Sequence, residues 1–461
     1  MLKESTAHSI IEKGFSHGAD FVDIFIEKNQ SLILNLKSSK IEQISDGIDF
    51  GLGIRVVFGE KALYGYTNST ELDELIRITN YLCELDRRNP KNFTQNFNLM
   101  KTPNYSQVRL GLDKAVKIEE KITFLRQIDQ KTREQSALIS QVMINSLERL
   151  QTVEIFNSEG LHAQDQRFYT RIGSSAVASD GGKQSSAFHG PGGFGGWEYT
   201  EQLNPQMIAE TIAKRALTTL NADPCPAGKM PVIIDHGFGG VIFHEACGHL
   251  LETTSVEKKA SVFWDKMGEK IAHSAVNAVD DGTVENGWGS INIDDEGMAT
   301  QRTQLIKDGV LQSFMVDRMG EIKTGFKRTG SGRKQSYRYA PASRMRNTFI
   351  EGGKHTLEEL IASVPNGLYA KSMGGGSVKP GTGEFNFSVE EGYIIKNGKI
   401  DKAVKGATLI GTGPETLTKI SMVGNNFSIS AGMCGSVSGS IPASVGQAAI
   451  KVDEILVGGA A

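Results

Sequence analysis

Apolar and polar residues alternate at every second position in several segments of the first half of the chain. This spacing is typical of strands with one buried face. It predicts strands at residues 22–26 and 32–36, a strand pair at 53–66 with its turn at 59–61, and a hairpin at 140–175 that turns at 157–160.

Helical spacing of apolar residues separates these strands. It predicts helices at residues 4–14 and 117–134. Asn68, followed by Glu71, indicates the start of another helix that runs to about Leu85. Asn204-Pro205 opens a helix to about Asn221, because proline suits the first turn.

The second half of the chain is rich in glycine and reads mostly as strands. Asp308-Gly309 and Asn397-Gly398 are strong signals for two-residue hairpin turns. One helix is expected at residues 356–364, and strands are expected at residues 230–235, 291–294, 303–306, 310–316, 393–396 and 450–456.

These patterns predict an α+β fold with two domains. A chain of 461 residues is long for one hydrophobic core. The Pro- and Gly-containing segment at 223–228 is the best linker, so we place an N-terminal α/β domain at residues 1–224 and a C-terminal β-rich domain at 225–461.

Composition narrows the possible partners and compartment. The net charge is −3, which argues against a nucleic-acid partner. The four cysteines form no CxxC pair, which favours a reducing compartment. The start of the chain lacks the apolar core of a signal peptide, and no run approaches the roughly 20 apolar residues of a membrane span. We therefore expect a cytoplasmic protein without a membrane partner.

The candidate chemistry lies in the segment from His244 to His249, with Glu245 directly after the first histidine. Histidines four apart share a helix face at about 40° separation, whereas a spacing of five leaves them about 140° apart. A π-bulge or an early helix end, eased by Gly248, would bring both rings to one metal. We therefore predict a metal-binding helix that is distorted between Ala246 and His249.

Catalytic zinc usually keeps three protein ligands and one open position. Cys434, which we expect in a flexible Gly-flanked turn, would complete the set with His244 and His249. Cys247 and Glu252 are competing metal ligands, and His236 is a candidate to contact one of the metal-binding side chains. The simplest alternative is a core histidine at 244 that is hydrogen-bonded to its neighbouring glutamate.

Several stretches of the chain together resemble the TldD/PmbA family of peptidases and modulator proteins, especially its TldD branch. The matching stretches are residues 243–249, 292–297, 329–333, 405–411, 420–425 and 432–447, with a looser match at 51–56 and 124–129. The resemblance implies metal ligation by His244, His249 and Cys434, with Glu245 catalytic. It also implies a two-domain fold and a dimer, either of this chain alone or with a PmbA-like paralogue.

The expected function is a metallopeptidase that hydrolyses unfolded peptides or small proteins, with Glu245 as general base. We expect one divalent metal per chain, with zinc preferred and iron as the alternative, since thiolate and imidazole ligands suit both. Two rival hypotheses remain. One is a non-catalytic modulator subunit with a structural metal, and the other is an amide hydrolase that acts on a small molecule.

Four further features have both a functional and a structural interpretation. Residues 329–333 fit equally a substrate clasp and a Gly turn with a solvated arginine. Residues 190–196 read as a surface loop that could also line the entrance to the site. The acidic run at 294–296 reads as a solvated strand end rather than a second cation site. Arg344 and Arg346 read as surface charge rather than as contacts to substrate or partner.

Overall fold

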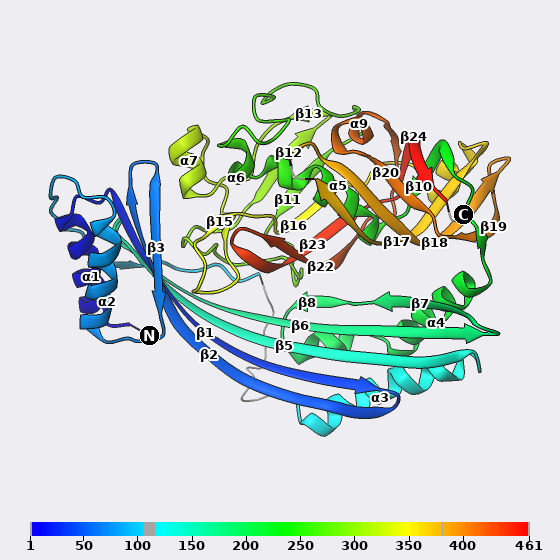
Figure 1. Ribbon diagram of the computed structural model, residues 1–461, viewed down its shortest axis with the longest axis horizontal. Helices are drawn as coiled ribbons and strands as arrows, with labels where there is room; N and C mark the ends of the chain where they lie inside the picture. The colour runs from blue at the N-terminus through cyan, green and yellow to red at the C-terminus, as the bar shows by residue number, and fades with distance from the viewer. Residues whose placement is uncertain (1, 106–115, 380, 460–461) are drawn as a thin grey trace.

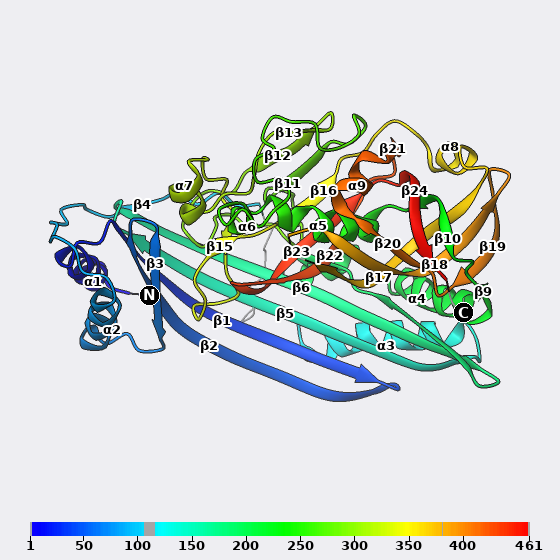
Figure 2. The same ribbon diagram turned by 45° about the horizontal axis from the view of Figure 1, so that its top comes forward.

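The computed structural model of the chain describes residues 2–105, 116–379 and 381–459. In these ranges the strands form two eight-stranded sheets, one six-stranded sheet and one two-stranded sheet. Most neighbouring strands are antiparallel. The long sheet of the N-terminal half extends along one side of the C-terminal elements (Figures 1 and 2). This arrangement agrees with the expected α+β fold.

The first sheet has the order β3-β2-β1-β5-β6-β4, and β7 and β8 also pair with β6. Its strands are β1 (Phe21–Lys37), β2 (Lys40–Phe58), β3 (Lys61–Thr67), β4 (Asn98–Leu99), β5 (Ile139–Asn157), β6 (Leu161–Asp180), β7 (Lys183–His189) and β8 (Gly192–Phe194). The predicted hairpin at 140–175 is confirmed as β5 and β6. The predicted strands at 22–26 and 32–36 are two parts of β1, because antiparallel pairing with β5 continues through the residues between them.

Helices pack near the two ends of this sheet (Figure 1). They are α1 (Glu4–Ser16) and α2 (Leu72–Glu84) at one end, and α3 (Ile118–Glu134) and α4 (Pro205–Asn221) at the other. All four helices were predicted, and Asn204 caps α4 by accepting a hydrogen bond from the backbone N–H of Gln206 at 2.9 Å. The predicted start at Asn68 is wrong, since α2 begins at Leu72 and Glu71 stands at its N-cap without a side-chain hydrogen bond.

In the C-terminal half, five strands close into a ring, because β17 pairs with both β10 and β18. The ring consists of β10 (Gly228–Ile234), β17 (Asn366–Lys379), β18 (Glu384–Lys396), β20 (Thr408–Thr412) and β24 (Ile450–Gly458). Three strands extend it: β9 (Asp223–Pro224), β19 (Lys399–Lys405) and β21 (Ile420–Val423). The predicted Asn397-Gly398 turn is confirmed, with φ angles of 52° and 70° between β18 and β19.

The third sheet has the order β13-β12-β11-β16-β23-β22. Its strands are β11 (Ala278–Asp281), β12 (Arg302–Lys307), β13 (Val310–Leu311), β16 (Asn347–Ile350), β22 (Ser428–Ser436) and β23 (Gly439–Gln447), while β14 (Gly332–Arg333) pairs with β15 (Ala342–Ser343). The remaining helical segments are η2 (Trp197–Gln202), η3 (Gly237–Gly240), α5 (Val241–Ala246), η4 (Gly248–Leu251), α6 (Thr253–Val256), α7 (Arg318–Thr324), α8 (Leu357–Ala362) and α9 (Gly413–Thr418).

Three sequence-based predictions in these regions need correction. Residues 190–196 are only partly a loop, since β8 pairs with β6. The strand predicted at 310–316 ends at Leu311. The strand predicted at 291–294 is absent from the described chain, because the Asp294 carboxylate accepts the backbone N–H groups of Glu296 and Met298 and closes a turn instead.

The segment between the two halves belongs partly to the C-terminal sheet, because β9 pairs in parallel with β19. The domain division at residues 224 and 225 stays a prediction. No helix in the described part of the chain is long and apolar enough to cross a membrane.

Candidate metal centre

The predicted distortion of the histidine segment is confirmed. Helix α5 ends at Ala246, and the backbone of Cys247 leaves helical geometry with φ −129° and ψ −45°. A separate 3₁₀ segment, η4, then carries His249. The rings of His244 and His249 lie 5.3 Å apart at an interplanar angle of 87°. An early helix end, rather than a π-bulge, therefore turns the second ring towards the first.

Gly248 permits this break through its small size rather than through an unusual backbone conformation. Its φ is not positive. A Cβ at this position would lie only 2.3 Å from the Sδ atom of Met345, whose side chain is fully buried. The absence of a side chain thus lets η4 pack directly against the segment that precedes β16.

Cys434 reaches the same place from β22. The expected flexible turn around it is wrong, because residues 428–436 form a regular strand in which Cys434 pairs with Ile441 of β23. Its Sγ lies 3.5 Å from Nε2 of His249. One ligand atom each from His244, His249 and Cys434 lies within 4.8 Å of the other two. The structure thus brings together the three side chains that were expected to bind metal.

The electrostatics of this cluster favour a thiolate. Burial alone would raise the pKa of the Cys434 thiol, but His244 and His249 hold that pKa well below its usual range. Burial would likewise lower the pKa of His249, whereas Glu252 and Cys434 raise it well above the usual value. A buried thiolate beside two imidazoles is a donor set that suits a soft divalent cation.

His244 supports this interpretation independently. Its side chain is 2% exposed, and none of the described residues offers a hydrogen-bond partner to its buried Nδ1. The alternative of a core histidine bonded to Glu245 therefore finds no support. An unpaired buried polar atom is costly, so such a group calls for a ligand.

Glu245 points towards the cluster without belonging to it. Its Oε2 lies 3.7 Å from Nε2 of His249, and its side chain is 28% exposed. Its carboxylate forms no hydrogen bond with any of the described residues. A carboxylate that is close to the ligand atoms and free to accept a proton fits the role of a general base.

The two competing ligands, Glu252 and Cys247, and the additional candidate His236 take other positions. Oε2 of Glu252 lies 3.0 Å from Nδ1 of His249, and this hydrogen bond directs Nε2 of the ring towards Cys434. Carboxylates commonly orient metal-binding histidines in this way. The Cys247 thiol faces Gly413, and burial raises its pKa. His236 is half-exposed and lies beside Asp235 at 2.8 Å.

The segment from Arg344 to Arg346 holds the cluster in place, a role that the sequence did not reveal. The prediction that these arginines are surface charges is wrong, because both are fully buried. Arg344 donates to the backbone carbonyl of Cys434 at 2.5 Å and to Ser438 and Gly439 at 2.8 Å each. The backbone N–H of Met345 donates to Glu252 at 3.2 Å.

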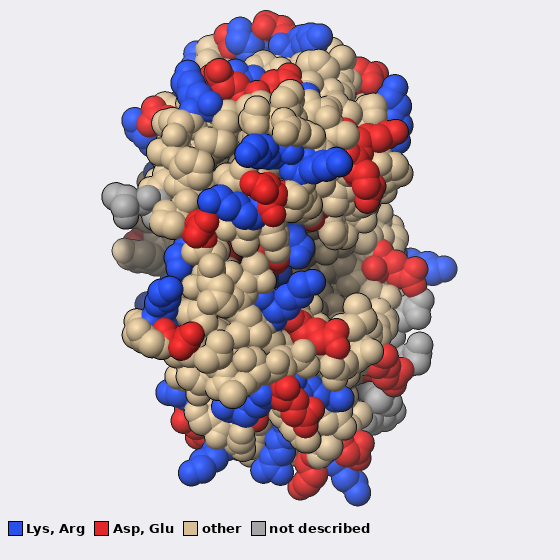
Figure 3. All heavy atoms as spheres, turned by 90° about the vertical axis from the view of Figure 1, so that its right-hand side faces the viewer, with Lys and Arg blue, Asp and Glu red and all other residues tan. Residues whose placement is uncertain are grey.

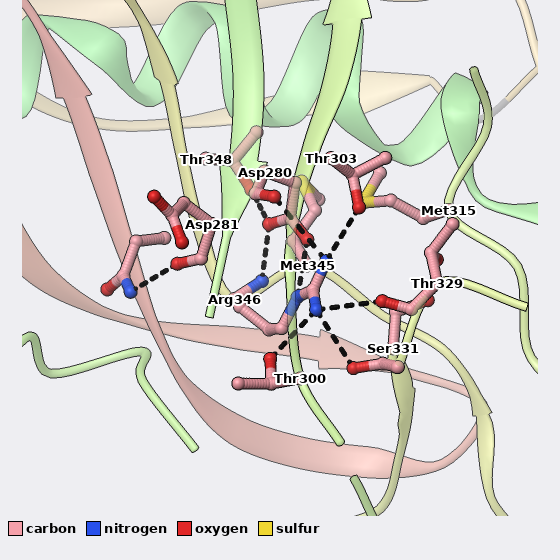
Figure 4. A network of polar contacts seen from close by, with 12 residues as sticks. Asp280, Asp281, Thr300, Thr303, Met315, Thr329, Ser331, Met345, Arg346 and Thr348 are labelled. Carbon is pink, nitrogen blue, oxygen red and sulfur yellow. Dashed lines mark hydrogen bonds and ion pairs between the residues drawn. The ribbon is translucent and has the colours of Figure 1, made fainter. Parts of the chain in front are cut away.

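Arg346 anchors this segment on its other side (Figure 4). Its backbone N–H and its Nε each donate to the Asp280 carboxylate at 2.7 Å. Its Nη1 also donates to Thr300 at 2.9 Å and to the backbone carbonyl of Thr329 at 3.0 Å. The residue between the two arginines therefore has little freedom to move away from Glu252.

Two other predicted surface features are also buried. Asp294, Asp295 and Glu296 are each 2% exposed or less, so the expectation of a solvated strand end is wrong. Arg333 is also buried and donates to the backbone carbonyl of Met345 at 2.7 Å, which contradicts a solvated arginine. Alternating or clustered charges in a sequence do not reveal a partner that lies far along the chain.

Three protein-family models match the chain. Models of the PmbA/TldA metallopeptidase match as domain 1 at residues 22–80, the central domain at 112–220 and the C-terminal domain at 227–459. The chain belongs to the PmbA/TldD family. The last match contains the whole candidate metal centre.

Individual relatives agree with this assignment. A metalloprotease TldD homolog of Haemophilus influenzae is 35% identical, over 99% of this chain and 97% of the relative. A zinc metalloprotease TldD homolog of Saccharolobus solfataricus is 27% identical, over 97% of this chain and 99% of the relative. The crystal structure of TldE from Thermococcus kodakarensis shares the fold, with a TM-score of 0.78, 17% identity and coverage of 98% of this chain and 99% of that one.

Proposed function

We propose that this chain is a metal-dependent peptidase that hydrolyses unfolded peptides or small proteins. The observation that carries the proposal is the convergence of His244, His249 and Cys434 within 4.8 Å, with the free carboxylate of Glu245 beside them. Relatives named as metalloproteases support the same function.

In this proposal, His244, His249 and Cys434 hold one divalent metal, which polarises the scissile carbonyl and lowers the pKa of water when bound. Zinc is the first choice, because the ligand set suits it and one relative is named a zinc metalloprotease, while iron is the alternative. Glu252 holds a proton on Nδ1 of His249 and so leaves Nε2 of that ring free as a ligand.

Glu245 supplies the proton transfer. Its carboxylate takes a proton from the attacking water and returns it to the amide nitrogen of the leaving group. The partial exposure of Glu245 gives water and substrate a route to a cluster whose other members are largely buried.

Replacement of Glu245 by Gln tests this assignment. E245Q removes the base but no ligand, so we expect full metal content and a loss of peptide cleavage of about 10²-fold or more. Metal analysis and cleavage of an unstructured peptide measure the two effects. E269Q, which changes an exposed glutamate beside Lys266, serves as the matched control and should change neither.

The same experiment distinguishes the peptidase from the rival function, a non-catalytic modulator subunit. A modulator subunit with a purely structural metal needs no general base, so E245Q would leave its behaviour unchanged. Unaltered cleavage by E245Q would refute the proposed mechanism. Absence of cleavage by the metal-loaded wild-type chain and its partner would favour the modulator.

We also propose that the chain acts as a dimer, with itself or with a paralogue, as the family resemblance implies. Ile44 and Ile48 on β2 are 50% and 67% exposed, which offers apolar surface for a partner. Light scattering of the purified chain, alone and with the paralogue, measures the assembly. A monomer under both conditions would contradict the proposal.

A further inference from the structure

A cavity of about 860 Å³ lies between the long N-terminal sheet and the C-terminal half. Its walls come from β6, β7, β8, η2, α4, η3, β17, β18 and β22. Seen from the end where α4 and β19 lie, the surface is hollowed between the two halves and carries both signs of charge (Figure 3). The cavity follows β22 from Ser428 to Met433, the residue directly before Cys434.

Arg171 of β6 lines this cavity next to β22. Its Nη2 donates to the backbone carbonyl of Ala431 at 3.1 Å, and its Nε donates to that of Gly190 at 3.3 Å. Its guanidinium also lies 5.6 Å from the ring centroid of Trp288. These contacts fix the group but use only two of its five N–H donors.

The charge of Arg171 is not neutralised within the part of the chain that the structure describes. No carboxylate there forms an ion pair with it, and burial lowers its pKa without an acidic group to offset the effect. The guanidinium nevertheless stays protonated at neutral pH. By contrast, the buried Arg55, Arg167 and Arg346 each bond directly to a carboxylate.

The acidic side chains of the cavity wall do not supply the missing partner. Glu390 lies 3.3 Å from Arg215, and Glu391 lies 2.7 Å from Lys371. Asp235 lies beside His236, and Glu210 accepts a hydrogen bond from Gln206 at 2.6 Å. A partly buried cation with free donors and no protein counter-ion calls for an anion from outside the chain.

We propose that Arg171 binds a carboxylate of the peptide substrate, either the C-terminal carboxylate or that of an Asp or Glu side chain. The inference rests on the proposed peptidase function and adds a specificity-determining residue to it. Arg171 touches Ala431, three positions before Cys434, which is roughly 10 Å along a strand. The carboxylate would therefore sit about three residues from the bond that is cut.

Two pairs of peptides test this inference. One pair has the same sequence with a free or an amidated C-terminus, and the other has Asp or Asn three residues after the cleaved bond. We expect wild type to prefer the carboxylate in at least one pair by about tenfold to hundredfold in kcat/KM, mostly through KM. We expect R171M to abolish that preference and R171K to retain part of it, because lysine keeps the charge but not the fork.

The responding pair identifies the source of the carboxylate. K214M is the matched control, since Lys214 is an exposed cation on another wall of the same cavity and should not change the preference. Thermal unfolding and metal content of each variant report whether R171M disturbs the fold or the metal centre.

Binding without turnover gives a second measurement. Labelled acid and amide peptides are titrated onto E245Q and onto E245Q/R171Q, and we expect a tenfold or larger difference in Kd only in the first protein. The inference would be overturned if E245Q bound the acid and amide peptides with equal affinity. It would also be overturned if the preference for the carboxylate survived the loss of Arg171. Cleavage that continues without any carboxylate preference would overturn only the role of Arg171, whereas intact cleavage by E245Q would overturn the proposed function.

Discussion

Cys434, which belongs to the candidate metal centre, and its neighbour Cys247 differ in what surrounds their thiols. Cys434 faces two imidazoles that lower its pKa, while Cys247 faces Gly413 and burial raises its pKa. The thiolate is the form that binds metal. We therefore expect C434S to lose most of its metal and its activity, while C247S retains both.

Metal content after dialysis and competition with a chelator measure this difference. C247S is the matched control, because it makes the same chemical change in an equally buried thiol. Full retention of metal by C434S would exclude Cys434 as a ligand and make Glu252 the next candidate.

Arg344 supports the metal centre through its contacts with Cys434 and Glu252. It bonds the backbone carbonyl of Cys434 and lies 3.9 Å from Glu252, so it connects two sides of the cluster. Loss of such supporting contacts commonly weakens metal binding by about 10- to 100-fold. We expect R344M to lower zinc affinity in this range and to shift the thiolate-to-metal absorption of the cobalt-substituted protein.

A second buried arginine, Arg167, provides a control that distinguishes an effect on the metal-binding residues from a general loss of stability. Arg167 bonds Asp165 and Asp295 and makes no contact with the metal cluster among the described residues. R167M should lower the melting temperature but leave metal affinity and the cobalt spectrum unchanged. Equal effects of R344M and R167M on metal affinity would show that Arg344 is merely structural.

At the scale of elements, α5 depends on close contact with β23. A Cβ on Gly240 would lie 2.4 Å from the carbonyl oxygen of Gly446. The backbone of Gly240 has φ −62°, which suits any residue, so only the lack of space requires glycine. We expect G240A to push α5 away from the sheet, to reduce stability by about 1–3 kcal/mol and to lower metal occupancy through His244.

Urea unfolding and metal analysis measure these effects. Gly47 on β2 has no atom within 4 Å of its would-be Cβ, which makes G47A the matched control. Unfolding of G240A at the wild-type midpoint with full metal content would contradict the importance of this contact.

The sequence predicted elements whose signals are local. Asn397-Gly398 and the Asn204 cap act within a few residues, and both appear as expected. The break after Ala246 was also predictable, because two histidines five apart cannot face one metal on a regular helix. The sequence made Cys434 the first choice for the third ligand, and the family resemblance implied the same residue. Its strand was mistaken for a turn because of its glycines.

Burial of charge could not be read from local pattern. Arg344 and Arg346 alternate as exposed strand residues do, yet their partners Ser438 and Asp280 lie far away in the sequence. The acidic residues at 294–296 look solvated for the same reason. The partners of the two arginines lie elsewhere in the C-terminal half. Asp295 and Glu296 instead pair with Arg167 and Arg55 of the N-terminal sheet.

Across the whole molecule, such pairs connect the two halves. Arg55 of β2 bonds Asp23 of β1 and, at 2.7 Å, Glu296 of the C-terminal half. Breaking a buried pair on one side typically costs about 3–5 kcal/mol, because the remaining charge stays buried. Ion pairs therefore help to fix the orientation of the long sheet, which forms one wall of the cavity beside β22.

The buried charges around Glu296 also make the stability of the fold depend on pH. Asp317 caps α7 beside Glu296, and burial together with that neighbouring charge raises its pKa from 3.8 to about 7. Between these pH values the folded chain holds a proton that the unfolded chain releases. This contribution to stability is therefore complete below about pH 4 and is lost as the pH rises to about 7, at up to about 1.4 kcal/mol per pH unit.

D317N isolates this effect, since asparagine keeps the acceptor that caps Gly320 but cannot ionise. We expect the difference in unfolding free energy between D317N and wild type to shift in favour of D317N as the pH rises from 5 to 8. Urea unfolding at several pH values measures it, with the exposed Asp265 changed to Asn as control. A constant difference between D317N and wild type across this range would show that Asp317 is ionised in the folded protein and that Arg55 compensates its burial.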